Sequence, residues 1–163
     1  MMIDPTAALW FLPFCLPIAV WVAWSDMKYM KIPNKAVMVM AAVWAVVGLL
    51  AFPLNTYLWG WAVLGIVLVA GFIANAVGLV GAGDAKFAAA MAPVFATGDP
   101  RLIFALFAAC LLGAFATHRI ARLIGPLRRA LPDWESWNRK DFPMGLALAG
   151  TLIFYLLAPF LAK

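Results

Sequence analysis

The sequence predicts an all-α membrane protein: one bundle of six transmembrane helices with its N-terminus outside. Its composition carries the first part of this prediction, because 67% of the 163 residues are hydrophobic and only 12% are charged. Soluble domains contain about 25% charged residues. Long apolar segments recur along the whole chain with short polar gaps between them, as expected of helices that cross a bilayer. We therefore expect a single membrane-embedded domain over residues 1–163.

The six expected spans are unequal in length. They cover residues 7–24, 36–52, 58–80, 84–97, 101–123 and 144–161. The fourth span would reach only about 21 Å, which is short of the roughly 30 Å hydrocarbon core. It either crosses where the bilayer is thin or forms a re-entrant loop. The first span lacks the positively charged start of a cleavable signal, so we expect it to be retained.

The distribution of basic residues favours six spans over five. Cytoplasmic loops of membrane proteins carry an excess of Lys and Arg. With six spans and the N-terminus outside, only Arg101 and Lys163 lie outside. The basic residues that then lie inside are Lys28, Lys31, Lys35, Lys86, Arg119, Arg122, Arg128, Arg129, Arg139 and Lys140. The net charge of +5 is thus explained by basic residues that act as topology signals. Because no DNA or RNA motif accompanies them, we expect no nucleic-acid partner.

The two cysteines indicate neither a disulfide framework nor a metal site. Cys15 and Cys110 both lie inside apolar segments, without a CxxC motif or a histidine-rich neighbour. Zinc sites need such ligand clusters at characteristic spacings. We therefore expect neither a disulfide framework nor a zinc site.

Two of the acidic residues occupy unusual positions. Asp26 ends the first span and Asp84 begins the fourth, so the predicted topology places both at the cytoplasmic edge of the bundle, where they can meet. Ionisable residues at this depth are costly and face the bundle interior or a water-filled cavity. The remaining acidic residues lie near the N-terminus, in a turn or in the polar segment 125–143, and need no special explanation.

Several interpretations of these aspartates stay open at the level of single residues. Asp is a good helix N-cap and glycine suits a tight turn, so Asp84, which follows Gly81 and Gly83 in the sequence, could have a purely structural role. Paired carboxylates also serve as proton relays, although no matching acid lies in the later spans. A phosphate loop is disfavoured because GxxxxGK[ST] and a preceding strand are both absent.

A close carboxylate pair can also catalyse hydrolysis. Two carboxylates that approach each other cannot easily both ionise, so one tends to hold a proton while the other stays charged. The charged member can take a proton from water as the water attacks a peptide carbonyl, and the protonated member can donate to the developing oxyanion or leaving group. Asp26 and Asp84 are the candidates for such a pair.

Three stretches of the chain resemble a known family. "SDMKYMKIPN", "GAGDAK" and "FPMGLALAGT" resemble, in this order and spacing, the signatures of prepilin peptidases, the bacterial aspartic membrane peptidases with a GxGD motif. The short form associated with tight-adherence (Tad/Flp) pili is the most similar. The resemblance implies that Asp26 and Asp84 are catalytic. It implies supporting roles for Gly81, Gly83, Lys86, Pro33 and Asn34. It implies no metal and no organic cofactor.

The resemblance also implies a substrate and a place in the cell. The protein would cleave the leader of a prepilin or pseudopilin at the cytoplasmic face of the bacterial inner membrane, with that substrate and the lipid bilayer as its partners. Bifunctional members carry an extra cytoplasmic region, often with paired CxxC motifs, and methylate the new N-terminus. This chain has no such region, so we expect proteolysis without methylation.

Two local expectations and two rival functions follow. Pro33 should fix a turn and Asn34 should cap the second helix, which would hold the loop after Asp26 in place. One rival is another GxGD peptidase, of the archaeal preflagellin or presenilin-like type, although Ser25 stands where presenilin-like enzymes usually have tyrosine. The other is a non-catalytic membrane carrier or pilus-assembly subunit that uses Asp26 and Asp84 for proton coupling or helix capping.

Overall fold

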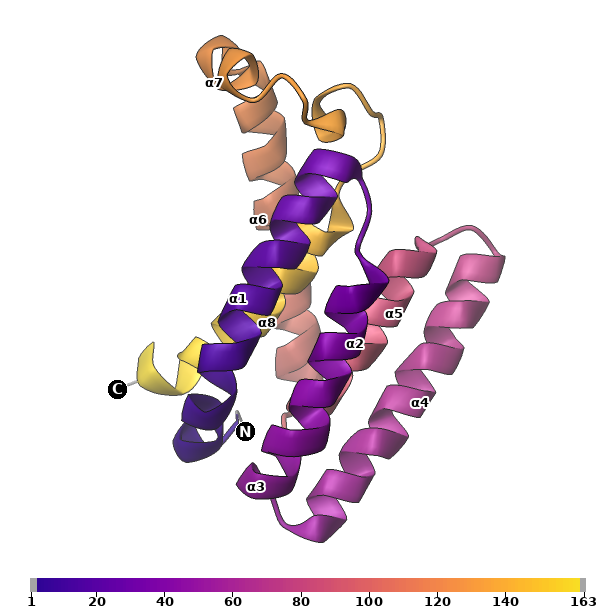
Figure 1. Ribbon diagram of the computed structural model, residues 1–163, viewed down its shortest axis with the longest axis vertical. Helices are drawn as coiled ribbons and strands as arrows, with labels where there is room; N and C mark the ends of the chain where they lie inside the picture. The colour runs from indigo at the N-terminus through magenta and orange to yellow at the C-terminus, as the bar shows by residue number, and fades with distance from the viewer. Residues whose placement is uncertain (1–2, 162–163) are drawn as a thin grey trace.

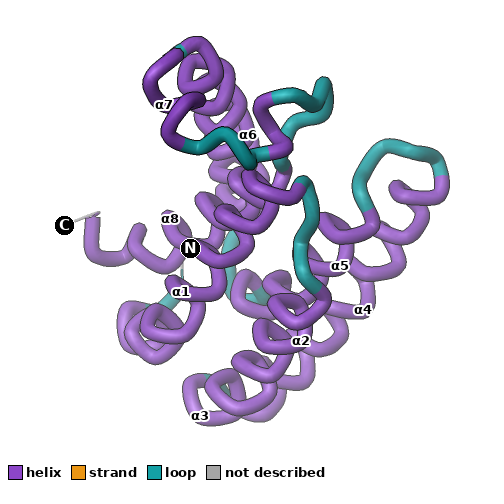
Figure 2. Tube along the Cα trace, turned by 45° about the horizontal axis from the view of Figure 1, so that its top comes forward, coloured by secondary structure: helices purple, strands orange, loops and turns teal. Residues whose placement is uncertain are grey.

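The computed structural model describes residues 3–161, and its regular structure over that range is entirely helical (Figure 1; Figure 2). The predicted all-α bundle is confirmed. Five helical segments among the described residues are long and apolar enough to cross a membrane. They are α1 (Pro5–Tyr29), the continuous α2 (Asn34–Val43), η1 (Trp44–Gly48) and α3 (Leu49–Ala51), then α4 (Leu54–Ala76), α6 (Pro100–Leu123) and α8 (Met144–Leu161). The chain is a multi-pass membrane protein.

The expected fourth span forms α5 (Ala82–Met91) followed by the 3₁₀ turn η2 (Ala92–Phe95). These elements have 10 and 4 residues, too few to cross a full-thickness bilayer alone. Figure 1 shows α5 running back along α4, with α4 and α6 pointing in the same direction. A re-entrant loop would return the chain to the side it had left and would make α6 antiparallel to α4. The arrangement is therefore the one that six passes require, and the number of crossings itself stays a prediction.

Helix α1 is longer than its apolar segment. Asp4 is its N-cap, with a side chain that accepts backbone N–H bonds, and Pro5 occupies the first turn, where its missing N–H costs nothing. The helix continues past residue 24 to Tyr29 and ends at Met30, whose φ of 52° is left-handed. This extension puts Asp26 inside the last turn of α1.

The interior of the bundle is built around α1 and α8, which pack along each other, and α2, which packs on α1 and α5. An aromatic cluster closes the end opposite Asp26: the ring of Trp44 stacks between Phe11 and Tyr57 at centroid distances of 5.8 and 5.9 Å. The same ring lies directly against Gly60 of α4, where a Cβ would overlap it. Helix α4 is therefore joined to the bundle by a large side chain on one element and a glycine on the other.

The segment between α6 and α8 contains α7 (Gly125–Ala130) and the short 3₁₀ turn η3 (Glu135–Trp137). It is tied to the end of α6 by arginines that donate to backbone carbonyls, Arg119 to Lys140 at 3.5 Å and Arg122 to Arg139 at 3.3 Å. Trp137 is 3% exposed and stacks on His118 at a centroid distance of 5.6 Å. Because η3 also packs against α1, this segment braces the helix that carries Asp26.

One end of the bundle collects the residues predicted to face the cytoplasm. In Figure 1, α7 and the ends of α1 and α6 lie at the top of the molecule, and the starts of α2, α5 and α8 are the upper ends of those helices. We call this the basic end. It carries Lys28, Lys31, Lys35, Lys86, Arg119, Arg122, Arg128, Arg129, Arg139 and Lys140.

Candidate active site

Asp26 and Asp84 line one pocket of about 330 Å³ at the basic end. Asp26 comes from the last turn of α1 and Asp84 from the first turn of α5. The α1–α2 loop and the α4–α5 loop, which lead into this region, lie at the same end of the bundle in both views (Figure 1; Figure 2). The other lining residues are Met30, Lys31, Ile32, Asn34, Gly81, Ala82, Gly83 and Lys86. Of the seven residues predicted for the site, the structure brings six to this pocket, and Pro33 lies outside its lining.

Asp26 is buried and is held by the start of α8. Asp26 is 5% exposed, and its Oδ2 accepts a hydrogen bond of 2.7 Å from the backbone N–H of Gly145. The first N–H groups of a helix have no partner inside the helix, and they form the positive end of its dipole. Helix α8 thus offers Asp26 a charge-complementary anchor.

The contact between Asp26 and Gly145 needs a glycine. A Cβ on Gly145 would lie 2.8 Å from the Cβ of Asp26 and 3.0 Å from its Oδ2, closer than side-chain atoms pack. Gly145 is a site residue that sequence reasoning missed. Its signal was the Phe-Pro-Met-Gly part of the third motif, but no single sequence shows that this glycine touches a residue 119 positions away.

Asp84 is not the N-cap of its helix. That position belongs to Gly81, with φ −65° and ψ 144°, and Asp84 is the third residue inside α5. The Asp84 carboxylate lies against Gly81, with its Oδ2 2.6 Å from where a Cβ of residue 81 would stand, and Asp84 occupies the helix position that the acidic residue of a capping box takes. Both carboxylates of the pocket therefore lie at a helix start: Asp26 accepts an N–H from the start of α8, and Asp84 stands in the first turn of α5.

The loop after Asp26 is fixed differently from the prediction. Asn34 does not cap α2; this expectation is wrong because Pro33, with φ −66° and ψ 135°, already occupies the N-cap position and Asn34 is the first helical residue. The Asn34 Oδ1 instead accepts from Lys86 Nζ at 3.5 Å and so links α2 to α5. The loop itself is closed by Ser25, whose hydroxyl donates to the Lys31 carbonyl at 2.9 Å.

The two motif glycines, Gly81 and Gly83, should differ in how well they tolerate substitution by alanine. A Cβ at Gly81 would lie 2.6 Å from Oδ2 of Asp84, whereas a Cβ at Gly83 would meet the nearest atom, Cβ of Ile32, at 3.4 Å. Because the carboxylate can rotate away, Gly81→Ala should leave folding nearly unchanged and displace the Asp84 oxygens.

We therefore expect Gly81→Ala to lower kcat/KM for the substrate by roughly 10-fold or more, since misplacement by about 1 Å can cost about 100-fold. Gly83→Ala should lower it by less. The measurement is steady-state peptidase kinetics on both purified variants beside their melting temperatures. Equal losses, or a loss only in Gly83→Ala, would contradict the positions assigned to the two glycines.

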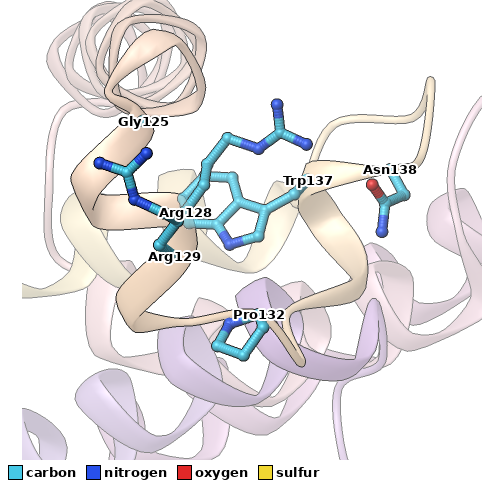
Figure 3. Close-up of a pocket in the computed structure, with 6 residues that line it drawn as sticks. All are labelled: Gly125, Arg128, Arg129, Pro132, Trp137 and Asn138. Atoms are coloured by element: carbon cyan, nitrogen blue, oxygen red, sulfur yellow. The ribbon is translucent and has the colours of Figure 1, made fainter.

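A second cavity at the basic end has different chemistry. It measures about 450 Å³ and is lined by Gly125, Arg128, Arg129, Pro132, Trp137 and Asn138. Figure 3 shows the side chains of Arg128 and Arg129 beside the indole of Trp137. None of the lining residues is a carboxylate, a thiol or a hydroxyl, so this cavity offers neither a nucleophile nor a general acid–base pair. Within residues 3–161, moreover, no group of three or more His, Cys, Asp or Glu side chains gathers.

Comparison with known proteins adds to this geometry. Residues 11–118 match the sequence profile of the type IV leader peptidase family, about two thirds of the chain, with both pocket aspartates inside the match. The chain belongs to the type IV leader peptidase family. Comparisons with curated proteins and with solved structures gave no match. The resemblance to prepilin peptidases is thus confirmed at the level of the family. Helix α8 of this leader peptidase, which carries Gly145, lies beyond the matched residues.

Proposed function

We propose that this protein is an aspartic endopeptidase that cleaves the leader peptide of type IV prepilins or pseudopilins, of the Flp type found in tight-adherence pili. The proposal places the reaction at the cytoplasmic face of the bacterial inner membrane, with Asp26 and Asp84 as the catalytic pair. One observation carries it: two carboxylates from helices far apart in sequence share a single pocket at the basic end of a membrane bundle.

In the proposed mechanism the two carboxylates share one proton. The ionised member takes a proton from a water molecule as the water oxygen attacks the scissile carbonyl carbon, and the protonated member donates to the carbonyl oxygen. When the tetrahedral intermediate collapses, the C–N bond breaks and the leaving amine takes a proton from the pair. Because the groups are coupled, their titration belongs to the pair and not to either residue.

The surrounding residues hold the pair in position. The N–H group of Gly145 fixes the Asp26 carboxylate, and rigid support of this kind keeps reacting groups in attack geometry. Lys86, held by Asn34, adds a positive charge to the wall of the pocket. We infer that the backbone from Gly81 to Gly83 forms the edge along which the substrate chain lies, because glycine allows close approach.

Cleavage without methylation is the expected outcome of a direct test. A Flp-type prepilin is co-expressed with the protein in a strain that has no other prepilin peptidase, and the product is examined by gel shift, N-terminal sequencing and mass spectrometry. We expect the leader to be removed and the new N-terminal amine to be unmodified. A product that carries one additional methyl group would refute the monofunctional assignment, and an intact prepilin would refute the peptidase.

A second candidate function has a specific observation in its favour. Asp26 accepts an N–H from the start of α8, and Asp84 stands in the first turn of α5, which are the places that purely structural caps in a carrier or assembly subunit would take. The two functions separate on Asp→Asn variants: an amide oxygen can still accept the N–H bond, so a cap tolerates asparagine well, but an amide can neither take nor give the catalytic proton.

A further inference from the structure

An apolar groove of about 380 Å³ lies among α4, α5–η2, α6 and α8. Its lining includes Val63 and Val67 from α4, Met91 from α5, Phe107 from α6 and Leu148 from α8. Thr151 is the one hydroxyl-bearing residue of this lining. Its hydroxyl donates to the carbonyl of Ala147 at 2.8 Å, so its hydrogen bond is made inside its own helix. The groove therefore offers an occupant almost nothing but hydrocarbon.

The groove lies one helical turn from the carboxylate pocket. Ala88 in its lining follows Asp84 on the same face of α5, one turn or about 6 Å further along. On the other wall Leu148 follows Gly145 by one turn of α8. Helices α5 and α8 thus start beside the two carboxylates, and their following turns form two walls of the groove.

The groove is open to the surrounding lipid. Helix α4 packs on α5 and η2, whereas α6 packs on α8, and the mouth of the groove lies between α4 and α6. Large apolar side chains stand at this mouth with much of their surface uncovered, Trp59 at 53% and Phe104 at 71% exposure. A segment already in the bilayer could therefore enter from the side.

The physics of the bilayer limits what can fill the groove. Backbone groups in an apolar environment must be hydrogen-bonded within their own segment, so the occupant is helical and apolar. The floor from Ala88 to Phe95 is about 12 Å long, the length of about eight helical residues. The volume has room for a few side chains and not for a whole helix, so the occupant lies across the mouth and inserts one face.

We propose that this groove binds the apolar helix of the membrane-anchored substrate. The helix lies between α4 and α6, and the extended residues before its N-terminus lie in the pocket, so that the peptide bond there reaches Asp26 and Asp84. The leader stays at the basic end. This inference rests on the proposed peptidase function and adds to it the surface that selects a substrate in which an apolar helix follows the cleavage site.

A pair of phenylalanines tests the groove. Phe104 lines it and is 71% exposed, while Phe72 on α4 is 72% exposed and lies outside the groove lining. We expect Phe104→Ala to raise KM for full-length prepilin in lipid vesicles by about fivefold through lost apolar contact, with kcat little changed. Phe72→Ala should behave like the wild type. A synthetic peptide that spans the cleavage site but lacks the apolar helix should be cleaved equally well by all three proteins.

A photoreactive residue at position 104 gives an independent readout that does not need a stable alanine variant. We expect it to cross-link to the prepilin helix, and the same residue at position 72 to give little prepilin cross-link. Cross-linking at position 104 to a second copy of this chain or to lipid alone would overturn the proposal, and so would equal KM values for Phe104→Ala and Phe72→Ala. If the wild type cleaves prepilin in any of these cases, the groove assignment fails and the peptidase stands. If the wild type cleaves neither substrate, the peptidase function fails first.

Discussion

Asp26→Asn and Asp84→Asn should each lower kcat/KM for leader cleavage by at least about 100-fold while the protein still folds. General acid–base catalysis by a positioned side chain contributes roughly 10²- to 10⁴-fold, and an amide supplies none of it. Folding should survive because an asparagine Oδ1 at position 26 can still accept the N–H of Gly145, and because asparagine at position 84 has nearly the shape of the aspartate that it replaces in the first turn of α5. The measurement is the initial rate of prepilin cleavage at equal amounts of membrane-inserted protein.

Asp4→Asn is the matched control for these variants. Asp4 accepts the N–H groups of Thr6 and Ala7 at 2.9 and 3.3 Å as the N-cap of α1, at the end of that helix opposite Asp26. Asparagine caps helices about as well as aspartate, so cleavage should match the wild type. Substantial cleavage by Asp26→Asn or Asp84→Asn would reduce that residue to the structural role that Asp4 has.

Gly145→Ala should be the most damaging substitution outside the two carboxylates. The added Cβ would lie 2.8 Å from Cβ of Asp26, which belongs to the rigid base of the side chain, so α1 and α8 must separate by several tenths of an ångström. Overpacking of this kind costs about 1–3 kcal/mol in folding stability. The shift moves Asp26 itself, so we expect kcat/KM to fall by roughly 100-fold. Cleavage kinetics and thermal unfolding in detergent measure the two effects.

Gly150→Ala controls for the same substitution in the same helix. A Cβ at Gly150 would meet its nearest atom, Sγ of Cys110, at 3.7 Å, an ordinary van der Waals contact. Activity should be retained and stability should be unchanged or slightly higher, because alanine is the better helix former. If Gly145→Ala were as active as Gly150→Ala, the contact between α8 and Asp26 would have no part in catalysis.

The helices and the position of the pair could be predicted from sequence because the signals for both are local. Apolar segments of membrane length mark the spans, and the last one, 144–161, coincides with α8. Lys and Arg placed Asp26 and Asp84 at one end, where the structure has them share a pocket. Hydropathy does not mark helix ends, however: α1 runs on through polar residues to Tyr29, since residues 18–32 contain neither glycine nor proline.

The supports of the site could not be predicted because they are tertiary contacts. Gly145 reaches Asp26 only once α8 packs along α1. Asn34 has the residue type of a cap, but the proline before it takes that position and its side chain bonds Lys86 on another helix. The hydroxyl of Ser25 closes the loop after Asp26, and a serine near a helix end has too many possible partners for its sequence to identify one.

The most direct test of the central claim, that Asp26 and Asp84 act as one catalytic unit, is a double-mutant cycle. Rates of leader cleavage are measured for purified wild type, Asp26→Asn, Asp84→Asn and the double variant in lipid vesicles. Groups that act as a unit are strongly non-additive, so each single variant should lose nearly as much activity as the double variant. Losses that multiply independently, or a single variant that keeps more than about a tenth of the activity, would contradict the account.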